Sequence, residues 1–528
     1  MDSVSFVFAL LKIALILGFL VTLTAVLTWV ERRQCALIQD RVGPNRAVVY
    51  VPGLALKLLA GGGGLGLGAA LAAAGMALRE HPKAMVVCFA AAAVVALAGV
   101  VGAVRVPSGT VGIRLAGMLH PVADGIKFIT KEDFVPPNGD RLLHALGPII
   151  ALFPALVTLA VVPFGDTLAV QLGAGGNLWS RLAHGRIGWA DSLRHYHAAV
   201  PRFGMPTLSP DLLPVPLQIV DLDVGILYIF ALAGTGIIGA AVAGWSSDNK
   251  YALLGGLRAA SQMVSYEVAM GLSLVGAFMI SSSLRLDDIV RWQSEHTWGI
   301  FVQPFAFVLF LATAVAEQKR TPFDAPEGES EIVAGYFLEY SGMKFSMFMM
   351  GEYMELIVSS ALLVTIFLGG YTIPFVHRDG ITLAFGDRVL WQAALPHVAL
   401  VALSVLVFFG KLLAVCFLQL FIRWTVPRFR YDQVMRLGWR RLLPAALVNM
   451  MLTGAALIAV DHASAGIDQA LRIAADVCNA VVVLGFAYGG VAFVRFLASR
   501  PKPQQELLST SAQRAHAQGG AHTSPMQA

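Results

Sequence analysis

Long apolar stretches alternate with short polar connections along almost the whole chain. About eleven of these stretches can cross a bilayer, because roughly 20 helical residues span its hydrocarbon core. They lie at residues 6–30, 54–78, 84–104, 146–164, 223–245, 257–283, 299–318, 345–370, 395–422, 442–460 and 472–497. No alternation of single apolar and polar residues competes with this pattern. The sequence therefore predicts an all-α, polytopic membrane protein with about 11 transmembrane helices.

The connection between the third and fourth predicted spans has a different pattern. It reads VGIRLAGMLHPVADGIKFITKEDFVPP, which is too polar to cross, yet apolar residues recur at helical spacing between Ile113 and Ile129. We therefore expect an amphipathic helix within residues 111–140 that lies in the membrane interface. Segment 166–221 is rich in Gly and Pro and predicts an outside loop. Residues 501–528 are polar and predict a disordered tail.

The charges between the spans predict how the chain is oriented. The first apolar run is too long for a secretory signal and ends in Glu31-Arg32-Arg33 without a small-residue cleavage site, so we interpret it as a retained span. The connections after the first, ninth and last spans are basic and fall on one side, which the positive-inside rule makes cytoplasmic. The net charge of +5 is therefore read as a topology signal and not as a nucleic-acid surface.

One segment concentrates acid in a chain of which only 13% is charged and 57% is hydrophobic. It reads EQKRTPFDAPEGESEIVAGYFLE, and its acidic residues are Glu317, Asp324, Glu327, Glu329, Glu331 and Glu339. Pro322, Pro326 and Gly328 prevent a continuous helix and predict turns. A solvated acidic loop is one interpretation. Because Lys319 and Arg320 adjoin the acids and apolar residues follow, we favour a segment folded against the bundle.

Ionisable residues also occur within or at the ends of predicted spans: Glu267, Glu317, Glu352, Glu355 and Lys411. Each costs about 2.5–3.5 kcal/mol at the centre of a membrane helix, so such residues are functional candidates. Glu352 and Glu355 are three residues apart and share one helical face. They predict a polar seam through the bundle. Buried ion pairs that only fix helix packing are the alternative.

Other familiar chemistries find little support. The four cysteines form no CxxC pair, which argues against a zinc or iron–sulfur site. Gly61, Gly63 and Gly66 formally match GxGxxG, but they lie within an apolar span and indicate close helix packing. His195 and His197 would need further metal ligands from elsewhere, and we interpret them as loop residues. Walker A, HExxH and GxSxG patterns are absent from the sequence.

Five segments resemble, in order, the signature segments of the H subunit of NADH-quinone oxidoreductase, respiratory complex I. They are ERRQCALIQDRVGPNR, HPVADGIKFITKED, LRAASQMVSYEVAM, AEQKRTPFDAPEGESEIVAGYFLEYSGMKF and FIRWTVPRFRYDQVMRLGWRRLLP. The resemblance covers roughly residues 5–46, 112–165, 221–370 and 395–460. His120 stands where many relatives carry glutamine. Residues 47–110, the loop at 166–220 and the last span with its tail are additions to the family pattern.

The resemblance implies a proton-pumping enzyme subunit of the respiratory chain at the junction of the membrane and peripheral arms. Its substrate would be a quinone such as ubiquinone, and this chain would line the quinone chamber. Catalytic groups for the headgroup, the flavin for NAD chemistry and the iron–sulfur clusters would all lie on partner subunits, with no metal in this chain. Expected partners are the peripheral-arm, small membrane and antiporter-like subunits, and membrane lipid. The expected location is the bacterial inner membrane, and spans 146–370 would resemble an antiporter-like five-helix half bundle.

Carried residue by residue onto this sequence, the resemblance implies two groups of site residues. The quinone-chamber group is Arg32, Arg33, Gln39, Arg41, Asp124, Lys127, Arg320, Phe323, Asp324, Glu327, Glu329 and Glu331. The group for a proton path toward the membrane arm is Glu267, Glu317, Glu339, Glu352 and Glu355. Reduction of a quinone in a dry chamber changes local charge, to which nearby carboxylates respond strongly.

The expected organisation has six parts. They are the first span with its loop (1–46), an inserted pair of spans (47–110), the amphipathic helix (111–140), the main bundle with its loop 166–221 (141–460), an extra span (461–500) and the tail (501–528). Two other functions stay open from the residues. A related subunit of a membrane-bound hydrogenase would keep the fold without a quinone, and a secondary transporter would use the buried acids for ion coupling.

Overall fold

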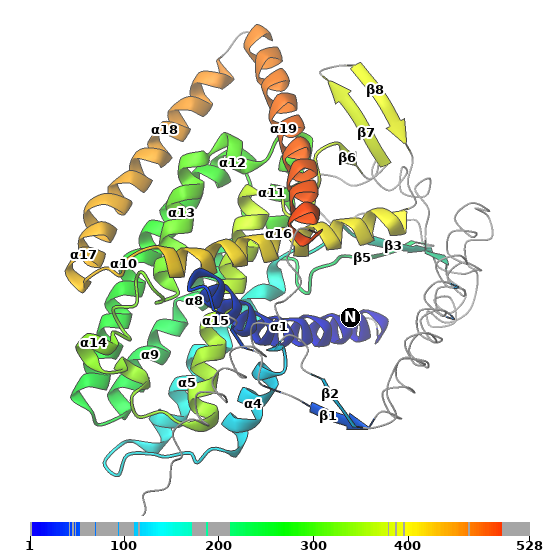
Figure 1. Ribbon diagram of the computed structural model, residues 1–528. Coiled ribbons are helices and arrows are strands. Elements are labelled where there is room, and N and C mark those ends of the chain that lie inside the picture. Colours follow the sequence, from blue (N-terminus) through cyan, green and yellow to red (C-terminus); the bar gives the residue numbers. More distant parts are fainter. Residues whose placement is uncertain are drawn as a thin grey trace, which may run out of the picture.

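The computed structural model of the protein describes residues 3–41, 43–44, 47, 49–52, 69, 93, 110–113, 117–171, 186–187, 212–377, 380–385, 388–393, 397–462 and 465–498. Helices dominate these residues (Figure 1). The α-helices are α1 (Ser3–Ile38), α4 (His120–Thr130), α5 (Arg141–Thr158), α8 (Gly225–Ala233), α9 (Thr235–Ser246), α10 (Lys250–Ser281), α11 (Leu286–Glu295), α12 (Gly299–Val302), α13 (Pro304–Glu317), α14 (Glu329–Ile332), α15 (Gly342–Phe367), α16 (His397–Thr425), α17 (Tyr431–Leu437), α18 (Leu443–Asp461) and α19 (Ala465–Ala498). Shorter helical turns lie at Leu159–Val161 (η2), Gly335–Phe337 (η3) and Gly438–Leu442 (η4), the last a π-helix.

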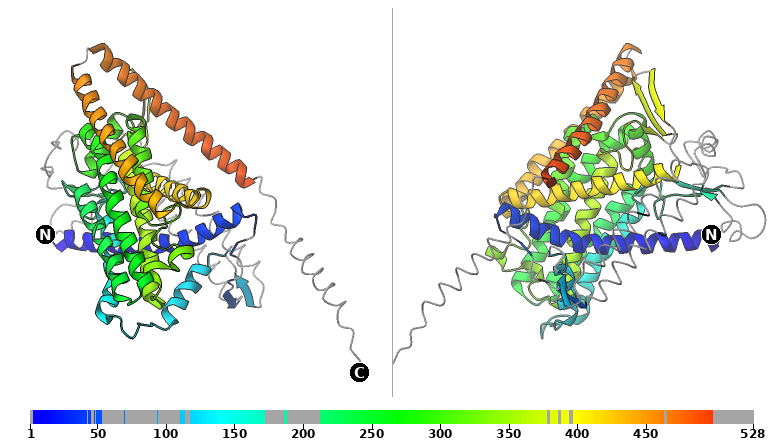
Figure 2. Two further views of the ribbon diagram at one scale, coloured as in Figure 1. Left: turned by 90° about the vertical axis from the view of Figure 1, so that its left-hand side faces the viewer. Right: turned by 45° about the vertical axis from the view of Figure 1, so that its right-hand side comes forward.

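The central helices α5, α9, α10, α13 and α15 form a bundle in which neighbours run side by side. Helices α1 and α16 cross this bundle obliquely and both pack on α15, as two viewing directions show (Figure 2). Helix α15 lies at the centre, since 78% of an apolar 18-residue stretch of it is buried, against at most 44% for the corresponding stretches of the other long apolar helices. It is therefore the helix on which the other segments of a buried site converge.

Small residues let the central helices approach closely. A Cβ added at Gly239 of α9 would lie only 2.6 Å from the backbone nitrogen of Ala151 in α5. A Cβ added at Gly255 of α10 would lie 2.6 Å from the Cα of Gly335. Backbones this close are typical of helix packing in membranes. The hydrophobic effect does not drive association there, and small residues allow the close van der Waals contact that does.

Local signals explain where several helices begin. Asp140 caps α5 by accepting hydrogen bonds from the amides of Leu142 and Leu143, and Asn249 caps α10 through the amide of Tyr251. Pro304 occupies the first turn of α13, where its missing N–H removes no helical hydrogen bond. The predicted span 299–318 is consequently divided into α12 and α13.

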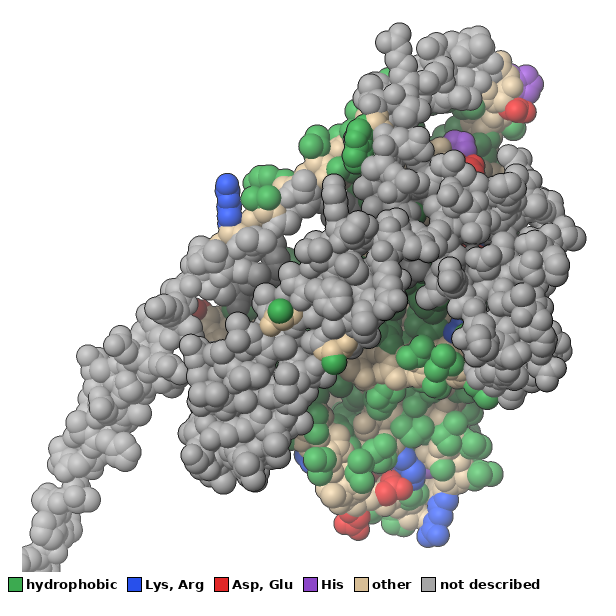
Figure 3. Space-filling model, turned by 90° about the vertical axis from the view of Figure 1, so that its right-hand side faces the viewer, with side chains coloured by type: hydrophobic (Ala, Val, Ile, Leu, Met, Phe, Trp, Pro, Cys, Tyr) green, Lys and Arg blue, Asp and Glu red, His purple; other side chains and the backbone are tan. Residues whose placement is uncertain are grey.

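The prediction of a polytopic helical membrane protein is confirmed. Seven described helices are long and apolar enough to span a membrane, and two shorter apolar helices, Pro304–Glu317 and Ile473–Gly485, fall within further predicted spans. The predicted spans 54–78 and 84–104 lie outside the described residues, so the total of about eleven stays a prediction. Many large apolar side chains of these helices face outward. On the face shown in Figure 3, hydrophobic side chains cover much of the described lower part and charged ones gather near its lower edge.

The segment expected to be amphipathic contains α4, and Val122, Ile126 and Ile129 are exposed along one side of it. Helix α4 packs across α1 and α15. Short strands, which the sequence pattern did not predict, form antiparallel sheets beside the bundle (Figure 1). They are β1 (Val49–Pro52) with β2 (Thr110–Ile113), β3 (Leu168–Gln171) with β4 (Arg186–Ile187) and β5 (Leu212–Val215), and β6 (Val376–His377) with β7 (Gly380–Phe385) and β8 (Arg388–Ala393).

Candidate functional site

A buried guanidinium is the centre of the candidate site. Arg320 is 3% exposed, and its Nη1 and Nε atoms donate to Glu31 at 3.2 Å and to Glu352 at 3.1 Å. Its guanidinium also lies 3.8 Å from the ring centre of Tyr353, a cation–π contact. Arg320 belongs to the connection between α13 and α15, Glu31 to α1 and Glu352 to α15. One side chain thus joins three segments that are far apart in the sequence.

Glu31 accepts two further hydrogen bonds. Tyr353 donates its hydroxyl to Glu31 at 2.6 Å, and Arg423 from the end of α16 donates to its other oxygen. The Glu31 carboxylate therefore has partners on both oxygens, although the residue is only 6% exposed. Helix α16 becomes the fourth segment held at this point.

Glu327 adds a third carboxyl group to a cluster that contains two guanidinium groups. Burial together with the repulsion from Glu352 raises the pKa of Glu327 well above its usual range. The Oε1 atoms of Glu327 and Glu352 are both buried without a hydrogen-bond partner. We call Glu31, Arg320, Glu327, Glu352 and Arg423 the Arg320 cluster.

The acidic connection folds against the bundle and is not a free loop. Phe323 is 5% exposed, and Gln262 of α10 donates to its carbonyl oxygen at 2.8 Å. Arg428 pairs with Asp324 at 2.6 Å. Glu331 is exposed at the surface of this chain, where it pairs with Arg258 at 2.7 Å. The solvated-loop interpretation therefore fails for most of this segment.

A single glycine, Gly335, permits a tight turn in this connection. Gly335 has a φ of +57°, and a Cβ added there would lie 1.8 Å from the carbonyl oxygen of Pro326. Only glycine fits a left-handed conformation with a backbone this close. The turn places Tyr336 in the core, where burial raises the pKa of its hydroxyl well above the usual range.

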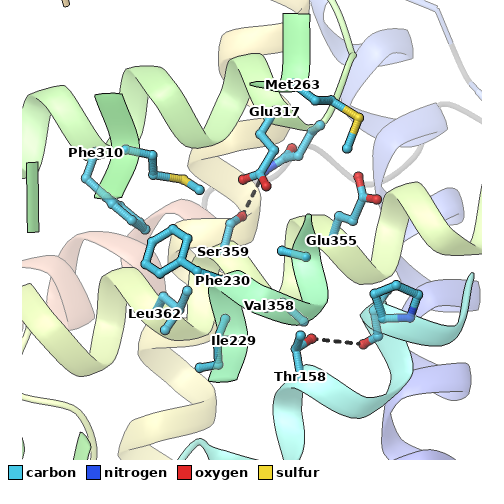
Figure 4. A pocket seen from close by; sticks show the side chains of 15 residues that line it. Thr158, Ile229, Phe230, Met263, Phe310, Glu317, Glu355, Val358, Ser359 and Leu362 are labelled. Carbon is cyan, nitrogen blue, oxygen red and sulfur yellow. Dashed lines mark hydrogen bonds between the residues drawn. The ribbon is translucent and has the colours of Figure 1, made fainter. Parts of the chain in front are cut away.

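Further carboxyl groups border a cavity inside the bundle. Glu317 and Glu355 line it together with Met263 and mainly apolar side chains. Figure 4 shows both carboxyl groups at one end of the cavity and Phe310, Ile229 and other apolar side chains toward the other. Lys319 pairs with Glu355 at 3.8 Å, and it directly precedes Arg320. The cavity therefore begins next to the Arg320 cluster.

The remaining predicted residues lie at other places. Arg32 of α1 pairs with Asp124 of α4 at 2.6 Å, and Lys127 lies 3.5 Å from the same carboxylate. Arg41 contacts the sulfur of Cys35.

Other predicted residues, Arg33, Gln39, Glu267 and Glu339, lie outside these groups, and the side chain of one more is not described. Gln39 is exposed. Glu339 accepts a hydrogen bond from Asn249 at 2.9 Å. The side chain of Glu329 lies outside what the structure describes.

The structure brings Arg320, Glu327 and Glu352 together, and it places Glu317 and Glu355 at one cavity. Sequence reasoning missed Glu31 and Arg423, although Glu31 stands at the start of a quoted motif, and it interpreted Tyr353 only as a structural hydrogen-bond donor. Its position at the end of the first span, beside two arginines, was a usable signal. Within the described residues, no group of three His, Cys, Asp or Glu side chains could hold a metal ion. His195 and His197 lie outside those residues.

Comparison with known proteins decides the family. A model of the NADH dehydrogenase family matches residues 83–454. The chain belongs to this family. It is 40% identical over 355 residues to the first of two H subunits of NADH-quinone oxidoreductase from Geobacter sulfurreducens, and the match covers 67% of this chain and 86% of that relative.

Two further relatives of this NADH dehydrogenase family match longer parts of the chain. The H subunit of the NADH-quinone oxidoreductase of Flavobacterium psychrophilum is 35% identical over 434 residues, or 82% of this chain and 91% of that protein. The corresponding protein of Flavobacterium johnsoniae is 32% identical over 460 residues, or 86% and 97%. These matches do not favour the hydrogenase or transporter alternatives.

Proposed function

We propose that this chain encloses, with partner subunits, the chamber in which a quinone is reduced, and that its buried carboxyl groups couple this reduction to proton movement. The chain itself is a multi-pass membrane subunit of an NADH-quinone oxidoreductase, as its family and relatives show. The quinone would be its substrate, and the redox centres would lie on partner subunits.

The observation that carries this proposal is the Arg320 cluster. Three carboxyl groups and two guanidinium groups are held between α1, α15, α16 and the acidic connection, and two carboxyl oxygens have no other partner. A purely structural ion cluster would balance its charges. An excess carboxyl group in a dry setting instead provides a place where a proton is bound, and a nearby change of charge would shift that proton's affinity.

The same geometry supports our proposal for part of the chamber group. Phe323, Asp324 and Glu327 are carried by the acidic connection beside Arg320, and Glu329 and Glu331 follow in α14. We propose that this connection and the loop after α1 face the chamber. The amphipathic helix α4 would border the opening through which the lipid-soluble quinone enters, since its exposed apolar side suits the membrane interface.

A route for protons toward the rest of the membrane arm would begin at Glu327 and Glu352. It would continue through Glu355 and Glu317, which line one cavity. Glu267 lies one turn beyond Met263 on α10, and its carboxylate approaches Gly234, which lies between α8 and α9. The cavity is large enough for water molecules to join these groups. Glu339, held by Asn249, would lie at the edge of this route.

The remaining parts of the proposal concern place and partners. We propose that the chain lies in a bacterial inner membrane with its basic connections and acidic segment in the cytoplasm. The partners would be the peripheral-arm subunits that contact the quinone headgroup, the small membrane subunits and the antiporter-like subunits, with bilayer lipid around them. We also propose the six-part organisation and the five-helix half bundle within residues 146–370.

The proposal is tested by replacing Glu331 with alanine in the assembled enzyme. Its ion pair with Arg258 is at the surface, so the loss should cost less than about 1 kcal/mol of stability. We expect quinone-dependent turnover to fall severalfold while NADH oxidation by an artificial acceptor is unchanged. Glu295→Ala is the matched control, because Glu295 is an exposed carboxylate at the end of α11. Equal turnover of the two variants, or equal loss of both activities, would count against the proposal.

A further inference from the structure

His144 is a buried histidine that neither the proposed chamber nor the proposed proton route uses. It lies one turn into α5, is 0% exposed, and stacks on Tyr340 with ring centres 4.0 Å apart and planes 5° apart. Tyr340 stands at the end of the acidic connection, and its hydroxyl lies 3.2 Å from Ser246 at the end of α9. The histidine ring therefore joins α5 to the last residues of that connection.

The neighbours of the ring determine which nitrogen carries its proton. Lys344 Nζ lies 3.4 Å from His144 Nδ1 and also pairs with Asp133 at 2.9 Å. An ammonium group can only donate, so Nδ1 accepts and carries no proton. The proton of the neutral ring is on Nε2, which lies 3.4 Å from the carbonyl oxygen of Glu339 and donates to it. The carboxylate of Glu339 is itself held by Asn249.

A second proton would not fit this arrangement. It would place an N–H group at Nδ1 against the ammonium of Lys344 in a buried site, where two positive donors repel each other strongly. The charged groups that face the ring are Lys344 from α15, Asp133 from the segment after α4, and Glu339. Burial raises the pKa of Tyr340 to about 12, although its bond with Ser246 lowers it somewhat, so this hydroxyl stays neutral across the physiological range.

We propose that His144 is a positioning residue whose neutral ring holds Glu339 and Tyr340 against α5, and that proton uptake by the ring releases this end of the acidic connection. The other end of the connection is held by Arg320. Release at one end would loosen the segment that carries Glu327 and Glu331. The effect on turnover rests on the proposed function, whereas the release itself is a property of this chain alone.

Hydrogen–deuterium exchange of residues 333–341 in the purified complex tests the release directly. Between pH 8 and pH 5, the range in which histidine titrates, exchange corrected for its intrinsic pH dependence should rise by up to about tenfold per pH unit. His144→Gln keeps an N–H donor but does not titrate, so its corrected exchange should be independent of pH. The same pH dependence in the wild type and in His144→Gln would overturn the inference.

Two further variants separate a pH response from simple loosening. His144→Phe keeps the aromatic stack but lacks both nitrogens, and Asn249→Ala removes the bond that holds Glu339 from the α10 side. His144→Phe should raise corrected exchange equally at all pH values, and Asn249→Ala should raise it while keeping the wild-type pH dependence. A pH-dependent rise in His144→Phe would contradict a role for the ring nitrogens.

Turnover distinguishes this inference from the proposed function. Quinone-dependent turnover should fall on acidification in the wild type and fall less in His144→Gln. If the two enzymes have the same acid limb while Glu331→Ala still loses quinone turnover, the role of His144 is refuted and the proposed function stands. Normal quinone turnover in Glu331→Ala would refute the proposed function, whatever the exchange data show.

Discussion

Replacing Glu327 with glutamine should stabilise the protein near neutral pH. In the folded chain, burial and the repulsion from Glu352 raise the pKa of Glu327 well above its usual range. The folded state thus binds a proton that the unfolded state releases at about pH 4.3. Stability contributed by this group is present below that value and falls as the pH rises toward the folded pKa. Glutamine has nearly the same shape and does not titrate.

The size of this effect has an upper limit. If Glu327 stays protonated in the folded state at pH 7, only the unfolded state gains free energy by ionising between about pH 4.3 and pH 7. This lowers the free energy of unfolding by at most about 4 kcal/mol. Glu327 is partly exposed, although its Oε1 atom is buried, and solvent reduces the effect below that limit. Any value up to that limit would be measurable as a change in thermal stability.

Thermal dissociation of the purified complex at pH 5 and pH 8 is a suitable assay. We expect Glu327→Gln to resemble the wild type at pH 5 and to dissociate at a higher temperature at pH 8, while its quinone-dependent turnover is reduced. Glu331→Gln is the matched control, because Glu331 belongs to the same segment but is exposed. A lower dissociation temperature for Glu327→Gln at pH 8 would refute a raised pKa of Glu327 in the cluster.

Two further predictions concern buried cations. Arg320→Met should destabilise the chain by about 3–5 kcal/mol and reduce the amount of assembled complex on native gels, because Glu31 and Glu352 would lose a buried partner; normal assembly would contradict the role of Arg320 as the centre of the cluster. Lys411→Met should lower the thermal dissociation temperature of the complex. Lys411 donates to the carbonyl oxygens of Leu368, Gly370 and Thr372 beyond the end of α15. A buried carbonyl that loses its hydrogen-bond partner costs about 1–3 kcal/mol. Lys411→Arg, which keeps the charge and donors, should be less affected than Lys411→Met, and the reverse order would speak against hydrogen bonding as the cause.

Lys411 shows that the sequence does not decide whether a charged residue within a span is functional or structural. From the sequence, Lys411 is one more ionisable group in a span and a candidate member of the polar seam. In the structure, the three backbone carbonyls accept its donors, and the ring of Trp298 lies 4.1 Å away. Lys411 therefore holds the end of α15 in place through hydrogen bonds. The alternative stated for the ionisable residues in the spans, a role in helix packing only, describes Lys411 better.

The sequence alone determined the helical class, most span positions, the amphipathic helix and the segment that carries the acids. Hydropathy is a property of each residue and its near neighbours, so a run of apolar residues can be read directly from the chain. The motifs also predicted Arg320, Glu327 and Glu352 as members of a candidate site. They did not indicate that these side chains would touch.

Only the tertiary structure decided which groups pair. Arg320 and Glu31 are 289 residues apart, and Arg423 and Glu31 are 392 apart. Their contact depends on how α1 and α16 cross α15, and on a turn that Gly335 permits. Other distant neighbours act in the same way: the pKa of Glu327 depends on Glu352, and the tautomer of His144 depends on Lys344 and Glu339. Pairing of this kind arises from the packing of distant helices, and no local pattern of residues encodes it.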